Sequence, residues 1–538
     1  MLPPGTDTPA FRSGLAGGWA DLNQRLGPDI ILNPESFSYG FKDKAETPPG
    51  WTEVPEVLRN SARSYYLRSG HEDEPNLLRA VARLKPTLAG LNPRIYFYGG
   101  GYMYALAAWT AVGAALTPAR LVRGVEWYME EPARMAWLYR LGRSFSAAAF
   151  LAVAWLLWST GRRFFGEDAG LAAAALWSAS PGFVVQAHYM KPHLMGAFLT
   201  LAAYRLAAEA LERGPRWGVA AGAAAGLAAG AVNHLGTAAV FPALAALMRW
   251  RAGRPWRGEA AWLGASAAAC VAAFLACTPY LLTEFSTTSA AMRAVGRFAG
   301  MSAGNLWTFA VSGLPAALGA PTAFLLAWGL AAAARSRGDA PRVLALAGFG
   351  LLYPTVFLNQ SAAGLDSVRY FGAAAVGLLL AGAAAAERGR AGLAAAALCV
   401  LAAGARSAVI DYNLALDAPG TSTREAAGDW LTREVPAGAE VGLLRLPQPA
   451  NAPTFRWDRY RLAFYEPSAF AALGDGAAVP EWLVLACPSY DDRPLVGGVL
   501  ARRYALARAF PQSGPAWLRP PDGQGWGNPL IEVYRRVP

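Results

Sequence analysis

Long apolar blocks recur along this chain of 538 residues. Segments such as 171–185, 262–277 and 322–334 contain no charged residue, and a helix needs about 20 apolar residues to cross the hydrocarbon core of a bilayer. Charged residues make up 16% of the chain, against about 25% in soluble globular proteins. The sequence therefore predicts a polytopic membrane protein, mainly α.

The net charge of +11 comes largely from arginines spread over short connections between the apolar blocks. A nucleic-acid-binding protein would gather such charges on one soluble face, so the pattern argues against that class of partner. Cytoplasmic loops of membrane proteins carry an excess of basic residues. We therefore expect the basic connections at 162–163, 213–216, 249–257, 335–342 and 388–390 to be cytoplasmic.

About ten spans are predicted from the apolar blocks. They are 136–160, 169–187, 193–211, 217–232, 236–249, 260–281, 305–334, 342–360, 369–386 and 391–410. Alternation then places the loops 188–192, 233–235, 282–304 and 361–368, and both ends of the chain, outside the cytoplasm. Because nothing before residue 135 reads as a signal peptide or spanning helix, we expect a further span before Met1. Segment 95–117 is interpreted as membrane-surface or re-entrant, since the glycines at 99–101 disfavour a regular helix.

The pattern changes after residue 410 to that of a soluble α/β domain. Ser422 and Glu425 form a predicted capping box for a helix that ends near Glu434. Short strands are expected at 440–444, 482–486 and 530–534, and a helix near 499–509. The predicted organisation is an extracytoplasmic N-terminal region over 1–135, a transmembrane helical domain over 136–410 and a small extracytoplasmic α/β domain over 411–538.

An acidic cluster, His71-Glu72-Asp73-Glu74-Pro75, lies on the predicted outer side. Two neighbouring carboxylates repel each other, which leaves a group able to accept a proton from a hydroxyl. Asp73 and Glu74 are therefore the candidate catalytic residues. The alternative is a solvated acidic loop.

The chain has four histidines, and the predicted topology places all of them on the outer side. Imidazole and carboxylate groups suit zinc or manganese, so a divalent metal is a possible cofactor. No helical spacing of histidines supports such a site, and no cofactor is certain. The candidate ligands are His71, His188, His193 and His234.

Positively charged residues on the outer side can bind a lipid-linked phosphate. Lys191 lies in the short loop HYMKPH, and Arg369 begins a span; the alternative is that both only anchor helices at the headgroups. Tyr98 and Tyr102, with Tyr96, Phe97 and Tyr104, can pack against a sugar or polyprenyl chain, or form an interfacial aromatic belt. The candidate substrate-binding residues are Arg369, Lys191, His193, Asn233, His234, Tyr98 and Tyr102.

In order along the chain, these segments resemble the C-type glycosyltransferase superfamily, specifically glycosyltransferase family 39, the dolichyl-phosphate-mannose protein mannosyltransferase-like proteins related to lipid A aminoarabinose transferases. The segments are HEDEP, LNPRIYFYGGGYMYAL, LYRLGRSFSA, GRRFFG, SPGFVVQAHY, CTPYLLTEF, VRYFGAAAVGLLL, TREAAGDWLTREVPAGAEV and IEVYRR. The resemblance implies a C-type glycosyltransferase fold. It also implies that Asp73 is the catalytic base, with Glu74 beside it, and that Arg369 lies near the lipid phosphate.

The chain departs from the family pattern in one loop. Where the family usually reads His-Tyr-x-x-Pro-Asp, this chain reads His188-Tyr-Met-Lys-Pro-His193. Either the site works without that carboxylate or the acceptor chemistry differs. The family also has a spanning helix before the Asp-Glu motif, which agrees with the expected span before Met1.

The predicted activity is inverting sugar transfer from a polyprenyl-phosphate donor to a hydroxyl of a glycan, lipid or protein acceptor, as in protein glycosylation. The predicted place is the outer face of the cytoplasmic (inner) membrane of the cell envelope, with membrane lipids as further partners. Two alternatives stay open: a transporter or flippase for a lipid-linked substrate, and a non-enzymatic membrane assembly protein. No repeated halves of the kind common in transporters are seen.

Overall fold

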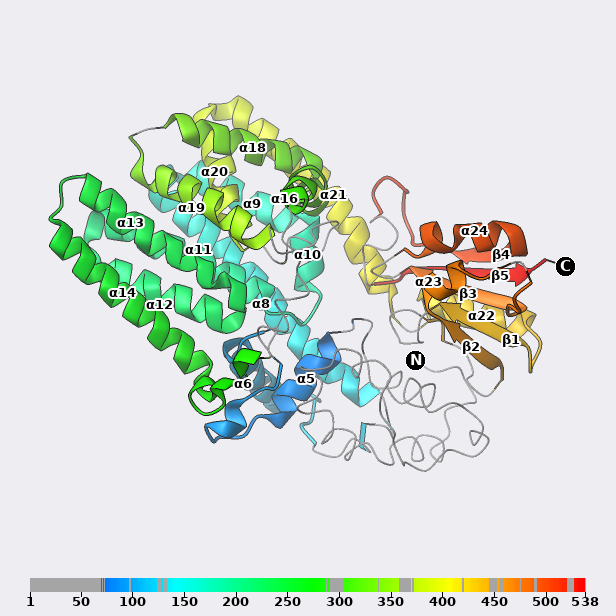
Figure 1. Cartoon of the computed structure of the whole chain (residues 1–538). Coiled ribbons are helices and arrows are strands. Elements are labelled where there is room, and N and C mark those ends of the chain that lie inside the picture. The colour runs from blue at the N-terminus through cyan, green and yellow to red at the C-terminus, as the bar shows by residue number, and fades with distance from the viewer. Residues whose placement is uncertain are drawn as a thin grey trace. The chain divides into compact units, whose positions relative to one another are not determined.

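The computed structural model describes a chain that is mainly helical (Figure 1). The described residues are 69, 71, 73–95, 98–122, 127–128, 131, 133–286, 288–290, 303–336, 338–357, 369, 372–418, 420–444, 452–454, 459–474, 476–487, 491–519 and 527–537. Two compact units divide the chain. Unit 1 comprises Met1–Asn76, Ala114–Arg140 and Val409–Pro538, and unit 2 comprises Leu77–Gly113 and Leu141–Ala408.

Unit 2 is a bundle of helices around one large apolar core. Its helices, some of which extend into unit 1, are α5 (Glu74–Arg83), α6 (Gly100–Leu116), α8 (Ala133–Phe165), α9 (Glu167–Ala179), α10 (Pro181–Ala187), α11 (His193–Arg213), α12 (Pro215–Ala231), α13 (Val240–Arg251), α14 (Trp256–Cys277), α16 (Ala303–Thr308), α17 (Leu314–Leu318), α18 (Ala320–Arg335), α19 (Ala340–Phe357), α20 (Ala374–Glu387) and α21 (Gly389–Leu416). Short turns of other helix types are η1 (Ala89–Leu91), η2 (Asn233–Ala239), η3 (Pro279–Leu282) and η4 (Phe309–Gly313).

Four helices within the described residues are long and apolar enough to cross a membrane: α8, α11, α14 and α21. Shorter helices occupy the other predicted spans, for example α12 and α20. The predicted fold class, a polytopic helical membrane protein with a small C-terminal α/β part, is confirmed by these helices and by the sheet of unit 1. The number of spans and the domain boundaries stay predictions.

A stripe of glycines lets α12 approach α14 closely, and the two helices lie side by side in Figure 1. The stripe repeats every fourth residue, at Gly218, Gly222, Gly226 and Gly230. A Cβ atom built on Gly226 would lie 2.1 Å from the carbonyl oxygen of Cys270. Small residues drive helix association in lipid because they admit close van der Waals contact. The stripe therefore fixes this helix pair.

Replacing Gly226 by Leu is expected to destabilise the protein by at least about 1–3 kcal/mol, because the new side chain must displace the α14 backbone. Gly264→Leu is the matched control, since a Cβ there meets nothing within 4 Å. Thermal unfolding of the two purified variants in the same detergent measures the difference. Equal melting temperatures would show that the stripe does not hold the pair.

The glycine run at 99–101 corrects one sequence expectation. These glycines were expected to disfavour a regular helix, yet α6 begins at Gly100. A Cβ built on Gly100 would lie 2.4 Å from the carbonyl oxygen of Cys277, and one built on Gly101 would lie 2.7 Å from its sulfur. Close packing against the end of α14 thus outweighs the low helix propensity of glycine.

The described C-terminal part of unit 1 is a sheet with helices on both faces. Strand order is β2-β1-β3-β5-β4, with β1 parallel to β2 and β3, and β5 antiparallel to β3 and β4. The elements are α22 (Thr423–Glu434), β1 (Glu440–Leu444), β2 (Arg461–Tyr465), α23 (Pro467–Ala471), β3 (Trp482–Cys487), α24 (Arg493–Arg503), β4 (Tyr504–Phe510) and β5 (Leu530–Arg536). Alternate residues of β3 enter two apolar cores, one under α22 and one under α23 and α24.

The predicted cap of α22 is confirmed, and one predicted helix is corrected. The Ser422 hydroxyl accepts a hydrogen bond from the Arg424 N–H at 3.1 Å, while Glu425 reaches back to the Gly420 N–H. The helix expected near 499–509 ends at Arg503, and 504–510 forms strand β4 instead. Its Ala, Leu and Arg residues favour a helix, but pairing with β5 decides the structure.

Candidate functional site

The loop that carries Lys191 is fixed to α8. The Lys191 N–H donates to the Ser146 hydroxyl at 3.4 Å, and that hydroxyl donates to the Lys191 carbonyl at 3.5 Å. The neighbouring Met190 packs so closely on Gly142 that a Cβ there would lie 2.0 Å from the sulfur. Lys191 is 1% exposed. A cation buried this deeply requires anionic or polar groups around it.

His193 is the first residue of α11 and is 4% exposed. Its ring meets the ring of Tyr98 edge to face, with centroids 5.7 Å apart and planes at 82°. The structure therefore brings two of the predicted site residues into direct contact. They come from positions almost 100 residues apart in sequence, so Tyr98 and the end of the HYMKPH loop lie side by side.

Asn233 and His234 lie at the same end of unit 2. The Gly99 N–H donates to the carbonyl of Ala231 at 3.0 Å, two residues before Asn233. A Cβ built on Gly196, in the first turn of α11, would lie 2.2 Å from the Leu235 side chain. The segment that starts η2 is thus packed against both the Tyr98 segment and the beginning of α11.

Arg369 joins this end of the bundle through the residues that follow it. A Cβ built on Gly372 would lie 3.2 Å from the Cα of Ala197, and Ala197 is one helical turn after His193. Gly372, three residues after Arg369 in the sequence, therefore lies against the beginning of α11. Tyr102 packs on Phe145 of α8, beside Ser146, and is fully buried. Its side chain therefore belongs to the packed interior of the bundle and does not line an exposed surface.

The acidic cluster belongs to unit 1 at the beginning of α5. The Asp73 N–H donates to Nδ1 of His71 at 3.1 Å, and the Asp73 carbonyl accepts from the Asn76 N–H at 3.1 Å. Asp73 is partly exposed, whereas His71 and Glu74 are buried. The positive end of the helix dipole favours both carboxylates there. Glu72, Tyr96, Phe97 and Asp366 lie outside the described residues.

Among the described residues, no three His, Cys, Asp or Glu side chains are grouped so that they could hold a metal ion. Nδ1 of His71 accepts the Asp73 N–H, and Nδ1 of His188 lies 3.0 Å from the Val184 carbonyl, so it donates. Each of these histidines therefore uses one ring nitrogen in a local hydrogen bond.

A polar cluster that the sequence analysis missed joins two of the family-like segments. The Asn92 amide donates to Glu284 at 3.0 Å, and Arg94 pairs with the same carboxylate at 3.5 Å. Burial, and then the charge of Arg94, lower the pKa of the Arg83 guanidinium. LNPRIYFYGGG and CTPYLLTEF thus meet at Glu284. The sequence offered one indication of this contact, because one segment carries the basic Arg94 and the other the acidic Glu284.

The helical bundle and this polar end define a multi-pass membrane protein with a candidate site built from loops at one end of unit 2. Residues 140–278 match the family model described as "Dolichyl-phosphate-mannose-protein mannosyltransferase". This segment contains α11, the HYMKPH loop and η2, and the match agrees with the resemblance that the sequence motifs indicated. No curated protein sequence matches the chain.

Several solved structures are similar to this chain at low sequence identity. The crystal structure of ArnT from Cupriavidus metallidurans in the apo state is 16% identical, with 86% of this chain and 92% of that chain covered and a TM-score of 0.44. The structure of the same enzyme bound to undecaprenyl phosphate is 13% identical, with 96% and 98% covered and a TM-score of 0.45. For the Archaeoglobus fulgidus oligosaccharyltransferase complex with Zn and sulfate, the values are 14% identity and a TM-score of 0.37, and the matching region covers 71% of this chain and 55% of that chain.

Proposed function

We propose that this protein is a membrane glycosyltransferase that moves a hexosyl or pentosyl group from a polyprenyl-phosphate carrier to an acceptor hydroxyl. The observation that carries the proposal is the mannosyltransferase-family match over 140–278. It is supported by the buried cation Lys191, which lies in the loop before α11, and by the contact of the neighbouring His193 with Tyr98. A phosphate that meets the apolar phase needs such cations around it.

The reaction is a single displacement at the anomeric carbon of the donor. Asp73 takes the proton of the acceptor hydroxyl, and the oxygen attacks the anomeric carbon from the face opposite the phosphate. The bond from that carbon to the phosphate oxygen breaks, and its electron pair leaves with the polyprenyl phosphate. Attack from the opposite face inverts the configuration of the anomeric carbon.

One base and one cationic clamp are enough for this chemistry. Phosphate is already a good leaving group once its charge is stabilised, so no general acid is needed, unlike the hydrolysis of an ordinary glycoside. In the proposal Arg369 and Lys191 hold the leaving phosphate, and Tyr98, Asn233 and His234 position the sugar, while the buried Tyr102 packs behind them on Phe145. Glu74, next to the base, keeps the local charge negative. The proposal places the reaction on the outer face of the cytoplasmic membrane.

His193 gives this site an imidazole where the family pattern has a carboxylate. The ring contacts Tyr98 and is held at the start of α11. An imidazole can donate or accept one hydrogen bond without adding a fixed negative charge. We therefore place His193 with the substrate-binding residues and leave proton removal to Asp73.

Transfer from labelled donors tests the proposal directly. The purified full-length protein is incubated with a panel of radiolabelled polyprenyl-phosphate sugars and a membrane extract as acceptor. We expect one donor to lose its sugar to an acceptor fraction, leaving polyprenyl phosphate. A protein that instead moves the intact donor between the leaflets of sealed vesicles, without cleaving it, is a flippase, and that result would overturn the proposal.

A further inference from the structure

The turn between α13 and α14, residues 249–259, is built on a buried ion pair. Arg249 donates to both carboxylate oxygens of Glu259, at 3.0 to 3.2 Å, and also to the carbonyl of Ala210 at 2.8 Å. Trp262 donates to Glu259 as well. The only acidic residue of the turn is thereby neutralised, and one C-terminal carbonyl of α11 gains a partner.

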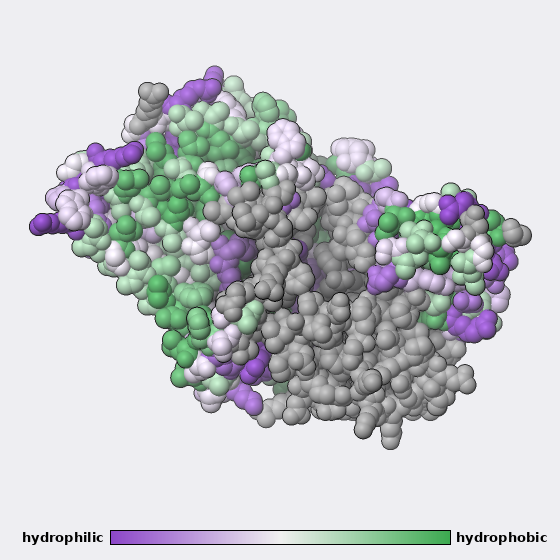
Figure 2. All heavy atoms as spheres, viewed as in Figure 1, coloured by the Kyte–Doolittle hydropathy of each residue, from purple (hydrophilic) through white to green (hydrophobic). Residues whose placement is uncertain are grey.

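Three further arginines of the turn point outward. Arg251, Arg254 and Arg257 are exposed, and within the described part of the chain none of them forms an ion pair. The turn therefore presents three exposed positive charges beside a single carboxylate, Glu259, which already pairs with Arg249. Figure 2 shows hydrophilic residues gathered at the end of the bundle where α13 meets α14, next to hydrophobic surface along α14.

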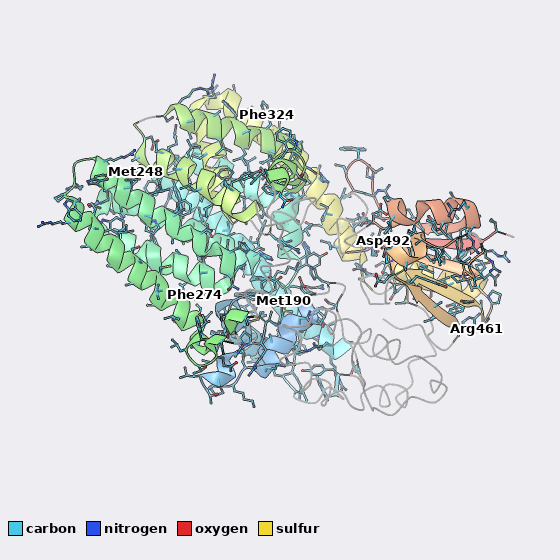
Figure 3. All side chains as sticks on the ribbon, viewed as in Figure 1. Met190, Met248, Phe274, Phe324, Arg461 and Asp492 are labelled. Atoms are coloured by element: carbon cyan, nitrogen blue, oxygen red, sulfur yellow. The ribbon has the colours of Figure 1, made fainter. Side chains whose placement is uncertain are left out.

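Two exposed tryptophans lie next to these arginines in the sequence. Trp250 is 52% exposed and Trp256 is 63% exposed, and Trp is enriched where a span leaves the hydrocarbon core for the headgroup layer. Trp256 is the first residue of α14, a candidate span that is mainly exposed along its length. Met248 and Phe274, labelled in Figure 3, mark the two ends of this helix pair. Exposed arginines and tryptophans at the start of a candidate span are typical of the headgroup layer.

We propose that the α13–α14 turn is a binding site for the headgroups of anionic phospholipids. Arginine recognises phosphate through paired N–H donors, and the flanking indole rings insert beside the acyl chains. The partner is the anionic lipid of the leaflet that touches the turn, which the basic connections predict to be the cytoplasmic one. This site is separate from the proposed transfer site, so either proposal can fail without the other.

Native mass spectrometry of the full-length protein in detergent tests the site by titration with phosphatidylglycerol or phosphatidylcholine. We expect tighter binding of phosphatidylglycerol. The variant R251Q/R254Q/R257Q should weaken that binding by up to about 100-fold, since each arginine near the headgroups contributes about fivefold. Phosphatidylcholine binding should stay the same. R251K/R254K/R257K keeps the charge but loses the paired donors, so it should bind phosphatidylglycerol more tightly than the glutamine variant and more weakly than the natural protein.

The matched control is R433Q/R461Q/R508Q, which removes three exposed arginines of the C-terminal sheet region and the same net charge. It should leave the lipid affinity unchanged. If the first glutamine variant does not fold, the natural protein in about 0.5 M salt replaces it, because screening should remove the preference for phosphatidylglycerol. Equal affinity of the natural protein for both lipids, or a loss in the control as large as in the turn variant, would overturn the proposal.

Discussion

Replacing Asp73 by Asn is expected to slow sugar transfer by about 10²- to 10⁴-fold while leaving donor binding intact, because Asn keeps the shape of the side chain but cannot accept the proton of the acceptor. The hydrogen bonds to His71 Nδ1 and from Asn76 use the Asp73 backbone, so they survive the substitution. Initial transfer rates at saturating donor, together with a donor titration, separate the two effects.

Asp168→Asn is the control for this experiment. Asp168 is an exposed residue in the first turn of α9, and its substitution should change neither rate nor binding. Undiminished transfer by the Asp73→Asn variant would eliminate Asp73 as the base. A fall in the donor affinity of the Asp73→Asn variant that equals its fall in rate would also contradict the assignment. A base acts on the chemical step and not on ground-state binding.

Much of the fold follows from the sequence because the bilayer restricts the choices. An apolar block of spanning length can satisfy its backbone polar groups only as a helix or in a closed barrel, so the helices α8, α11, α14 and α21 were predictable. Strand β1 was predicted at its observed bounds, since EVGLL carries a short apolar run between turn residues. Strand β4 was not, because YALARAF has the composition of a helix and gains its structure from β5.

The close contacts of the bundle are harder to obtain from sequence. The repeat of glycines along α12 is visible in the sequence, but its partner α14 is fixed only by packing. The glycines at the start of α6 show the same limit. Their low helix propensity predicts no helix, but close packing against Gly230 and Cys277 stabilises one. A local rule fails where a contact distant in sequence contributes more free energy than the propensity difference of about 1 kcal/mol.

The candidate site was partly predictable for a related reason. Lys191 stands out because it is the only lysine after residue 85, and His193 stands out because the chain has only four histidines. The contacts around these residues depend on helix packing that the sequence does not show, such as Gly372 against Ala197. The Asn92, Arg94 and Glu284 cluster went unnoticed because its members are almost 200 residues apart.

Removing the side chain of Arg369 by substitution with Ala is expected to lower kcat/KM for the donor by about 10²- to 10³-fold, the usual loss when one preorganised group is removed from a developing negative charge. The charge on the phosphate grows as its bond to the sugar breaks, so kcat should fall more than the donor affinity. Arg390→Ala is the matched control, because Arg390 is an exposed arginine at the beginning of α21.

Arg369→Lys distinguishes a phosphate clamp from a structural arginine. Lysine keeps the positive charge but offers a single ammonium in place of the planar pair of donors, so a clamp should recover part of the lost rate. A donor that carries a better leaving group than alkyl phosphate should also be less sensitive to the Ala substitution, because less charge needs stabilising in its transition state. If the Ala variant responds to the donor like the natural protein, Arg369 only positions α20 against α11, and the leaving phosphate must be held by Lys191 alone.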